Sequence, residues 1–218
     1  MSKVIVSEEI IKEKIEKTEL VIYLDECAAG VLSGDLYVCG VVIKKDALLK
    51  ISGLNDSKKL SEKKRAELFP QIIEKAVDYE LVKMSPQEVD TLNVFQARME
   101  GFKRAIDILS KRTGATYAVI DGNKKPANTA VETDVLVKAD AILPGVSCAS
   151  IIAKHSHTLY INELCKQELY KKYGFENHKG YGTKLHLEKL KEYGPIHGFH
   201  RMSYKPVYLN IKKDISWV

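Results

Sequence analysis

Four acidic residues stand at the ends of three apolar runs, and this pattern constrains the fold more than any other feature of the chain. The runs are VIYLDE with Asp25 and Glu26, YAVIDG with Asp121, and VLVKAD with Asp140. Apolar runs rich in β-branched residues are typical of buried strands, and a carboxylate at the end of such a run costs desolvation energy unless a cation or a donor meets it. The three run ends therefore predict one shared metal pocket.

Oxygen ligands of this kind suit the hydrolysis of phosphodiesters. Two hard divalent ions about 4 Å apart can activate a water and stabilise the leaving oxygen, and they bind oxygen ligands rather than thiolates. The simpler explanation is that each aspartate caps the helix or turn that follows it. Capping explains any one of these residues, whereas a metal pocket explains all of them together.

The composition is that of a reduced, globular protein with one main core. The chain has 218 residues, of which 45% are hydrophobic, and its four cysteines form no CxxC pair. This length suits one sizeable core with a smaller appendage, and the cysteine pattern favours neither a disulfide framework nor a zinc site. Charges recur throughout the first 17 residues and no apolar run reaches spanning length, so we expect a cytoplasmic protein without a membrane segment.

Positive charge gathers near the C-terminus. From residue 166 onward there are eleven Lys and Arg but only five Asp and Glu, whereas residues 1–165 carry 23 and 24. A basic tail beside an acidic pocket is consistent with a surface that contacts the phosphate backbone of a nucleic acid. A solvated, charged surface is the simpler reading of such an excess.

The order of predicted elements indicates a mixed α/β sheet flanked by helices. Apolar periodicity predicts an amphipathic helix over residues 8–18. Strands are expected near 20–25, 36–43, 78–84, 117–121 and 134–138, and helices after Ser61, over 86–110, from Ser147 onward and over 183–193. The glycine-containing segment GFENHKGYGT separates the last two helices.

Seven motifs carry a resemblance to a known family. They are DE at 25–26, LNDSKKLS at 54–61, VIDGN at 119–123, VKAD at 137–140, ASIIAK at 149–154, HKGYGT at 178–183 and HRMSYKP at 200–206. In this order they resemble type 2 ribonuclease H, the ribonuclease HII family, over residues 20–207. The resemblance implies a ribonuclease H-like α/β fold with three parts: an N-terminal helix (1–18), a catalytic core (19–165) and a basic helical extension (166–218).

The resemblance also implies an activity and its ligands. Members of this family cleave RNA in RNA/DNA duplexes and nick 5′ of a ribonucleotide embedded in DNA, so both kinds of duplex are the expected partners, and a monomer is expected. The implied metal ligands are Asp25, Glu26, Asp121 and Asp140, which would hold two Mg²⁺ or Mn²⁺ ions. One ion, among the first three, would activate water, and the other, nearer Asp25 and Asp140, would stabilise the leaving 3′ oxygen.

Asp25 and Glu26 pose a geometric problem, because adjacent residues of a regular strand point to opposite faces. The strand must end or twist there, or Glu26 must offer its backbone carbonyl. The small residues Ala28, Ala29 and Gly30 permit such a turn.

Several further residues match substrate-binding positions of the family. Ser57, Lys58 and Lys59 match its phosphate-handling segment, although a lysine-rich loop before a helix explains them equally well. Lys138 could face the pocket of Asp140 by strand alternation and pair with a carboxylate or a phosphate.

Two residues of the tail complete the expected substrate site. Tyr181, between glycines, matches a tyrosine that packs on the deoxyribose beside the junction, although a tyrosine packed under a glycine loop is the alternative. Arg201 matches a family arginine and is expected to pair with an acidic group or a phosphate. The tail histidines lack thiolate partners and ligand-like spacing, so we expect phosphate contacts or surface positions rather than zinc.

The chain departs from the family where the substrate should be recognised. Ala28, Ala29 and Gly30 replace a Gly-Arg-Gly segment whose amides approach the 2′-OH and whose arginine contacts phosphate. Alanine replaces glycine at 139, and His-Thr replaces Arg-Asp at 157–158. The C-terminal YLNIKKDISWV lacks a sliding-clamp peptide. A nuclease of RNA/DNA hybrids without junction specificity, or a catalytically weakened nucleic-acid-binding homologue, is therefore an alternative function.

Overall fold

The computed structural model describes residues 6–54 and 60–211, and its centre is a mixed sheet. Within these residues the sheet has five strands in the order β3-β2-β1-β4-β5. The strands are β1 (Val21–Cys27), β2 (Leu36–Ile43), β3 (Ala76–Met84), β4 (Tyr117–Asp121) and β5 (Glu132–Leu136). β2 is antiparallel to both β1 and β3, whereas β4 is parallel to both β1 and β5. The predicted mixed α/β sheet is confirmed.

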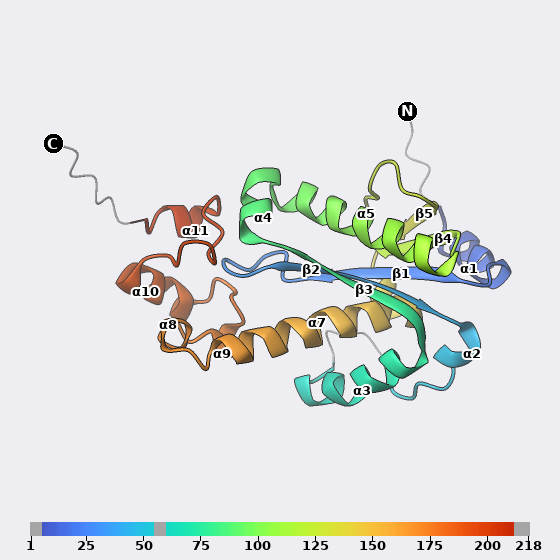
Figure 1. Ribbon diagram of the computed structural model, residues 1–218, viewed down its shortest axis with the longest axis horizontal. Helices are drawn as coiled ribbons and strands as arrows, with labels where there is room; N and C mark the ends of the chain where they lie inside the picture. The colour runs from blue at the N-terminus through green and yellow to red at the C-terminus, as the bar shows by residue number, and fades with distance from the viewer. Residues whose placement is uncertain (1–5, 55–59, 212–218) are drawn as a thin grey trace.

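Helices cover both faces of the sheet (Figure 1). The helices are α1 (Glu8–Lys17), α2 (Lys45–Leu48), α3 (Glu62–Lys75), α4 (Pro86–Leu92), α5 (Val94–Thr113), α6 (Ala139–Ile142), α7 (Pro144–Leu164), α8 (Glu168–Lys171), α9 (Phe175–His178), α10 (Lys184–Tyr193) and α11 (Lys205–Tyr208). In Figure 1, α4 and α5 lie over one face, α3 and α7 lie over the other, and α8–α11 gather at the end of the sheet opposite α1. None of the helices within residues 6–54 and 60–211 is both long and apolar enough for a membrane crossing.

The alternation of side chains along β1 divides the core in two. Ile22 and Leu24 pack in a cluster that includes Phe102 of α5. Tyr23 and Cys27 pack in the other cluster, with residues of α7. Because both faces are covered, β1 reads as a continuous apolar run rather than as an alternating one.

Close packing at Gly145 fixes α7 against β1. A Cβ built on Gly145 would lie 2.4 Å from the ring of Tyr23, so no larger residue fits at this point of the helix. The resulting contact brings the first turns of α7 alongside the acidic end of β1.

The predicted helix over 86–110 is two helices. Asn93 separates α4 from α5 with φ 63° and ψ 160°, and its side chain accepts hydrogen bonds from the backbone N–H groups of Phe95 and Gln96. A positive φ cannot continue a right-handed helix, and asparagine is a strong N-cap, so this one residue both ends the first helix and begins the second. The helix predicted from Ser147 begins earlier, at Pro144.

The chain also turns earlier than expected before Asp140. β5 ends at Leu136, and Lys138 adopts φ 61° at the start of the short helix α6, which carries Asp140. The prediction that a strand runs to residue 138 is wrong, because a left-handed residue interrupts the extended backbone.

Candidate active site

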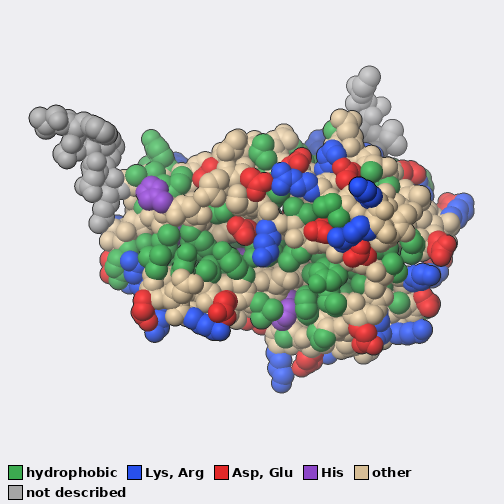
Figure 2. All heavy atoms as spheres, in the orientation of Figure 1, with side chains coloured by type: hydrophobic (Ala, Val, Ile, Leu, Met, Phe, Trp, Pro, Cys, Tyr) green, Lys and Arg blue, Asp and Glu red, His purple; other side chains and the backbone are tan. Residues whose placement is uncertain are grey.

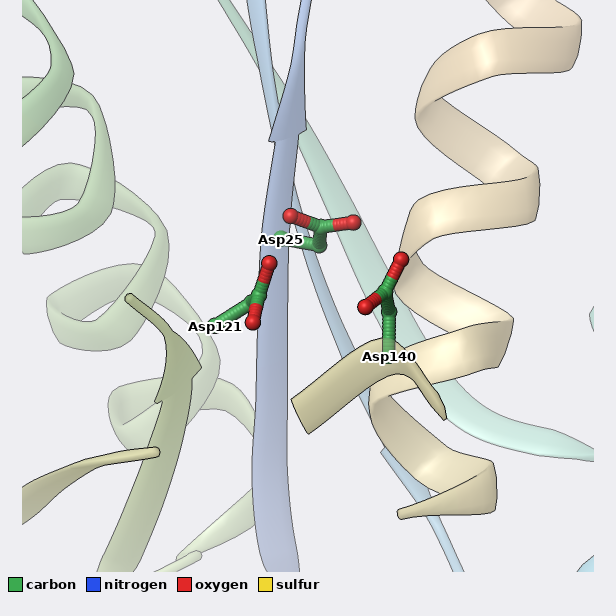
Figure 3. Close-up of side chains that lie close together, drawn as sticks. All are labelled: Asp25, Asp121 and Asp140. Carbon is green, nitrogen blue, oxygen red and sulfur yellow. The ribbon is translucent and has the colours of Figure 1, made fainter. Parts of the chain in front are cut away.

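Three aspartates from three elements form a compact acidic cluster. Asp25 of β1, Asp121 at the end of β4 and Asp140 of α6 point toward one another (Figure 3). Each offers a carboxylate oxygen that lies within 4.8 Å of those of the other two. Asp25 and Asp140 are each only 3% exposed. The structure thus brings together three of the four predicted ligands.

The strand order explains why these residues meet. β1 and β4 are parallel neighbours, with Leu24 opposite Ile120, so Asp25 and Asp121 follow at the same edge of the pair. The Asp121 carboxylate then accepts a hydrogen bond of 2.7 Å from the backbone N–H of Ala139. This bond ties α6 to the end of β4 and brings Asp140 into the cluster.

The electrostatics of the cluster favour a bound cation. Burial and the nearby charge of Glu26 raise the pKa of Asp25 to about 8, whereas a hydrogen bond from Ser150 and the charge of Lys154 oppose this rise. The Lys154 ammonium donates to the Ser150 hydroxyl at 2.9 Å. Three buried or half-buried carboxylates at this spacing form an all-oxygen donor set, which fits a hard divalent ion.

Glu26 lies apart from the three aspartates. β1 continues through Cys27, so the side chain of Glu26 points to the α5 face and accepts a hydrogen bond of 3.0 Å from Arg98. Its Oε2 atom is buried and has no hydrogen-bond partner among the described residues. Burial raises the pKa of Glu26, and the Arg98 charge counteracts that rise. Of the three alternatives given above, a strand end does not occur here, and opposite-face geometry keeps the Glu26 side chain out of the aspartate cluster.

The loop after β1 is held by a buried arginine. Arg201 is 0% exposed and donates to the carbonyl oxygens of Ala28 at 2.9 Å, Ala29 at 2.8 Å and Gly34 at 3.1 Å. Its guanidinium therefore contacts protein backbone, where we had expected an acidic group or a phosphate. Ala28 is buried with φ 62°, a conformation that favours glycine.

The Tyr181 loop lies against the same segment. The backbone N–H of Leu32 donates to the Gly180 carbonyl at 2.8 Å. Gly180 has φ +87°, and a Cβ there would lie 2.9 Å from the Ser33 carbonyl oxygen, so glycine is required. Tyr181 is 48% exposed, and its partial burial raises the pKa of its phenol. The fold thus places an accessible ring beside residues 28–34.

Three tail histidines are buried and linked, contrary to the expected surface positions. His178 and His186 stack with ring centroids 4.5 Å apart, and the Nε2 atoms of His186 and His200 lie 3.2 Å apart. The other ring nitrogen of His186 meets the Tyr181 carbonyl at 3.0 Å, and Nδ1 of His200 accepts from the Ile196 N–H at 2.8 Å. Because Nδ1 of His200 accepts, its Nε2 donates to Nε2 of His186, and Nδ1 of His186 donates to the Tyr181 carbonyl. Both rings are therefore neutral, and burial lowers the pKa of His186 to about 4 and that of His200 to about 3. His157, on α7, is buried as well.

Among the predicted substrate residues Lys138, Ser57, Lys58 and Lys59, the structure describes only Lys138. Lys138 is exposed at the left-handed turn before α6 and is not part of a strand. The prediction from strand alternation that it faces the pocket of Asp140 therefore does not hold. Ser57, Lys58 and Lys59 fall outside the described residues.

Sequence reasoning missed Ser150, Lys154 and Arg98 as site residues. Ser150 and Lys154 stand four apart in the ASIIAK motif, a spacing that puts both on one face of a helix, so that signal was present. Arg98 meets Glu26 across 72 residues of sequence, and no local pattern marks that contact.

The fold and the cluster together define the class of protein. The fold is shared with solved nucleases of the ribonuclease H class. The ribonuclease H2 of Pyrococcus horikoshii superposes with a TM-score of 0.74 at 26% identity, covering 88% of this chain and 96% of that protein. The ribonuclease HII of Archaeoglobus fulgidus, solved in a complex with PCNA, gives a TM-score of 0.70 at 29% identity, covering 85% and 95%.

Sequence comparison narrows the class to one family. The family model for Ribonuclease HII matches residues 22–207. The ribonuclease HII of Pseudoalteromonas atlantica is 42% identical over 194 residues, which cover 89% of this chain and 94% of the relative. The chain belongs to the ribonuclease HII family.

Proposed function

We propose that this ribonuclease H depends on divalent metal ions, cleaves RNA within RNA/DNA duplexes, and nicks 5′ of ribonucleotides embedded in DNA. The observation that carries the proposal is the approach of three carboxylates from Asp25, Asp121 and Asp140 to within 4.8 Å. Buried like charges this close are costly without a cation, and family membership supplies the reaction to which such a cation belongs.

Asp25, Asp121 and Asp140 would hold Mg²⁺ or Mn²⁺. Glu26 would join them through its backbone carbonyl, or through its side chain after release from Arg98. When bound, such ions supply an activated water and neutralise charge at the leaving oxygen. Ser150 and Lys154 orient the Asp25 carboxylate from the α7 side.

The C-terminal part of the chain would complete the substrate site. We assign residues 166–218 to an extension that presents Tyr181 to the deoxyribose side of a junction, and residues 19–165 to the catalytic core. Lys58, Lys59 and Ser57 would contact phosphates. A single chain brings the three aspartates together, which supports action as a monomer, and all four cysteines are free, which supports a cytoplasmic location.

One observation favours a second candidate function. Ala28 holds a left-handed conformation with its methyl group buried, where the family has glycine, and Ala29 has no guanidinium. A loop altered in this way supports cleavage of longer RNA/DNA hybrids without junction specificity.

Two substrates compared side by side test these proposals. A DNA duplex with one embedded ribonucleotide and a uniform RNA/DNA hybrid are incubated with the protein in Mg²⁺, in Mn²⁺ and in EDTA. We expect cleavage of both substrates with metal and of neither in EDTA. Cleavage of the hybrid alone would support the second function, and binding without cleavage in either metal would contradict both.

A further inference from the structure

A pocket borders the active site on the α5 face of the sheet. It has a volume of 350 Å³ and is lined by Ala29, Gly30, Val94, Phe95 and Arg98. One wall is the loop after β1, and the other is the first part of α5. Arg98 joins this pocket to the acidic end of β1 through its 3.0 Å bond to Glu26, the neighbour of Asp25.

The pocket presents an aromatic ring and a cation together. Phe95 is 40% exposed although it is large and apolar. The Arg98 guanidinium lies 5.8 Å from the centre of that ring. The Nε atom of Arg98 is buried and has no acceptor among the described residues. The bond to Glu26 therefore uses only part of the hydrogen-bonding capacity of the Arg98 guanidinium.

The surface of the pocket is mostly apolar and carries one cation, Arg98, and this combination suits the base or sugar of a nucleotide together with its phosphate. An exposed ring stacks on bases or sugars of any sequence, and a guanidinium binds phosphate through a planar fork of donors. The opposite wall is open to close approach, because a Cβ built on Gly30 would meet no atom within 4 Å.

We propose that this pocket, the α5 subsite, binds one nucleotide of the duplex substrate. Phe95 packs on its base or sugar, and Arg98 contacts its phosphate while remaining close to Glu26. Arg98 thereby provides from α5 the guanidinium that Ala29 lacks in the loop on the opposite wall. This inference rests on the proposed function and adds a specific subsite to it.

Binding measured without turnover tests the subsite. The wild-type chain and its Arg98→Ala, Arg98→Lys and Phe95→Ala variants are titrated with the single-ribonucleotide duplex in EDTA at several salt concentrations. We expect Arg98→Ala to lower the slope of log affinity against log salt by about one unit. Arg98→Lys should keep that slope but bind more weakly, because it loses the fork, and Phe95→Ala should weaken binding roughly fivefold to a hundredfold.

A rescue experiment separates substrate contact from support of Glu26. Ala29→Arg, introduced into the Arg98→Ala background, should restore the salt slope, because residue 29 lines the same pocket. Arg112→Ala is the matched control, since Arg112 also lies on α5 but pairs with Asp78 and Glu80 of β3. Its affinity and slope should equal those of the wild type.

The failures of the two proposals are distinguishable. If the wild type cleaves the duplex in Mg²⁺ while the Arg98→Ala and Phe95→Ala variants bind with wild-type affinity and slope, the α5 subsite is wrong and the proposed nuclease function stands. Phe95 is exposed, so its variant tests the subsite even if loss of Arg98 disturbs folding. If Arg98→Ala loses cleavage with unchanged binding, Arg98 acts through Glu26 and the subsite is also wrong.

Discussion

Asp25 shows at the scale of one residue how the site is built at the expense of stability. Its carboxylate is buried beside Asp121 and Asp140, and burial together with the charge of Glu26 raises its pKa to about 8. The folded, metal-free protein therefore binds a proton at this site between about pH 4 and pH 8, where an unfolded aspartate is already ionised. The contribution of Asp25 to stability should therefore fall as the pH rises through that range.

We expect Asp25→Asn to stabilise the metal-free protein. The substitution removes a buried like charge, so the gain should grow as the pH rises from 5 to 8 and should reach on the order of 1 kcal/mol or more at pH 8. Thermal unfolding in EDTA at both pH values measures it. Asp134→Asn is the control, because Asp134 is buried but accepts bonds from Lys14 and Tyr117. That variant should be less stable, and a loss of stability in Asp25→Asn would contradict the account.

Ala28 carries a conformational cost in the loop between β1 and β2. Its φ of 62° lies in the left-handed region, which costs a non-glycine residue about 1 kcal/mol or more. Its carbonyl is nevertheless fixed by Arg201. The strain is therefore maintained by the packing of the C-terminal extension on this loop.

We expect the Ala28→Gly/Ala29→Arg variant to nick a single embedded ribonucleotide faster than the present chain. Glycine relieves the strain and removes a methyl group where the backbone should approach the 2′-OH. If Arg98 already contacts phosphate, most of the gain should appear in Ala28→Gly alone. Initial rates on the single-ribonucleotide duplex measure it, and the uniform hybrid is the control. Equal rates for the present chain and the double variant would mean that the loop does not limit recognition.

At the scale of elements, periodicity predicted the strands and helices but not the points where single residues interrupt them. β1, β2 and β4 are near-continuous apolar runs, so their burial was readable. The break at Asn93 and the turn at Lys138 depend on positive φ, which no apolar pattern records. Strand alternation correctly predicts that the side chains of Asp25 and Glu26 point to opposite faces of the sheet. Arg98, the partner of Glu26, is 72 residues away in the sequence and could not be predicted.

The histidine cluster makes the Tyr181 loop sensitive to acid. His186 and His200 bond each other as neutral rings, and burial lowers their pKa values to about 4 and about 3. An unfolded histidine binds its proton near pH 6.5, so the unfolded state binds more protons between about pH 6.5 and pH 4. Stability from these residues is complete above pH 6.5 and is lost as the pH falls.

We expect each of these two histidines to contribute a decrease of about 1.4 kcal/mol per pH unit in the free energy of unfolding as the pH falls from 6.5 to 4, in addition to the opposite contribution of Asp25. Urea titrations at several pH values between 4 and 7 measure the slope. His186→Gln should remove the contribution of one residue. His197→Gln, at an exposed position, should leave the slope unchanged. A slope that is the same in the His186→Gln variant and the wild type would exclude the cluster as its source.

At the scale of the whole molecule, the C-terminal extension and the β1–β2 loop form one unit. Residue pairs 32 and 180, 34 and 199, and 201 and 32 share backbone hydrogen bonds. The extension thus fixes the conformation of the β1–β2 loop and also carries Tyr181. The sequence motifs predict that these segments share one site. They also predict that Arg201 pairs with an acidic group or a phosphate, which is wrong for this structure because its burial depends on a tertiary contact that no motif records.

Nearby acidic side chains partly neutralise the excess of positive charge in residues 166–218. Several of its lysines pair with glutamates one helical turn away, as Lys189 does with Glu192 at 2.8 Å. Positive and negative side chains are also intermingled on the face of the molecule shown in Figure 2. Net charge alone therefore does not locate the nucleic-acid surface. The acidic cluster, the β1–β2 loop and the Tyr181 loop predict its position better.

The rate of cleavage of a single-ribonucleotide duplex by Asp140→Asn, measured against Mg²⁺ concentration, tests the central claim most directly. Asp140 belongs to the cluster of three carboxylates and comes from the short helix α6. Loss of its charge should lower the rate by about a hundredfold or more, as removal of one preorganised electrostatic group does in other active sites. Asp134→Asn, which changes a buried carboxylate outside the cluster, should retain activity wherever it remains folded. A near-wild-type rate and Mg²⁺ dependence for Asp140→Asn would contradict the account.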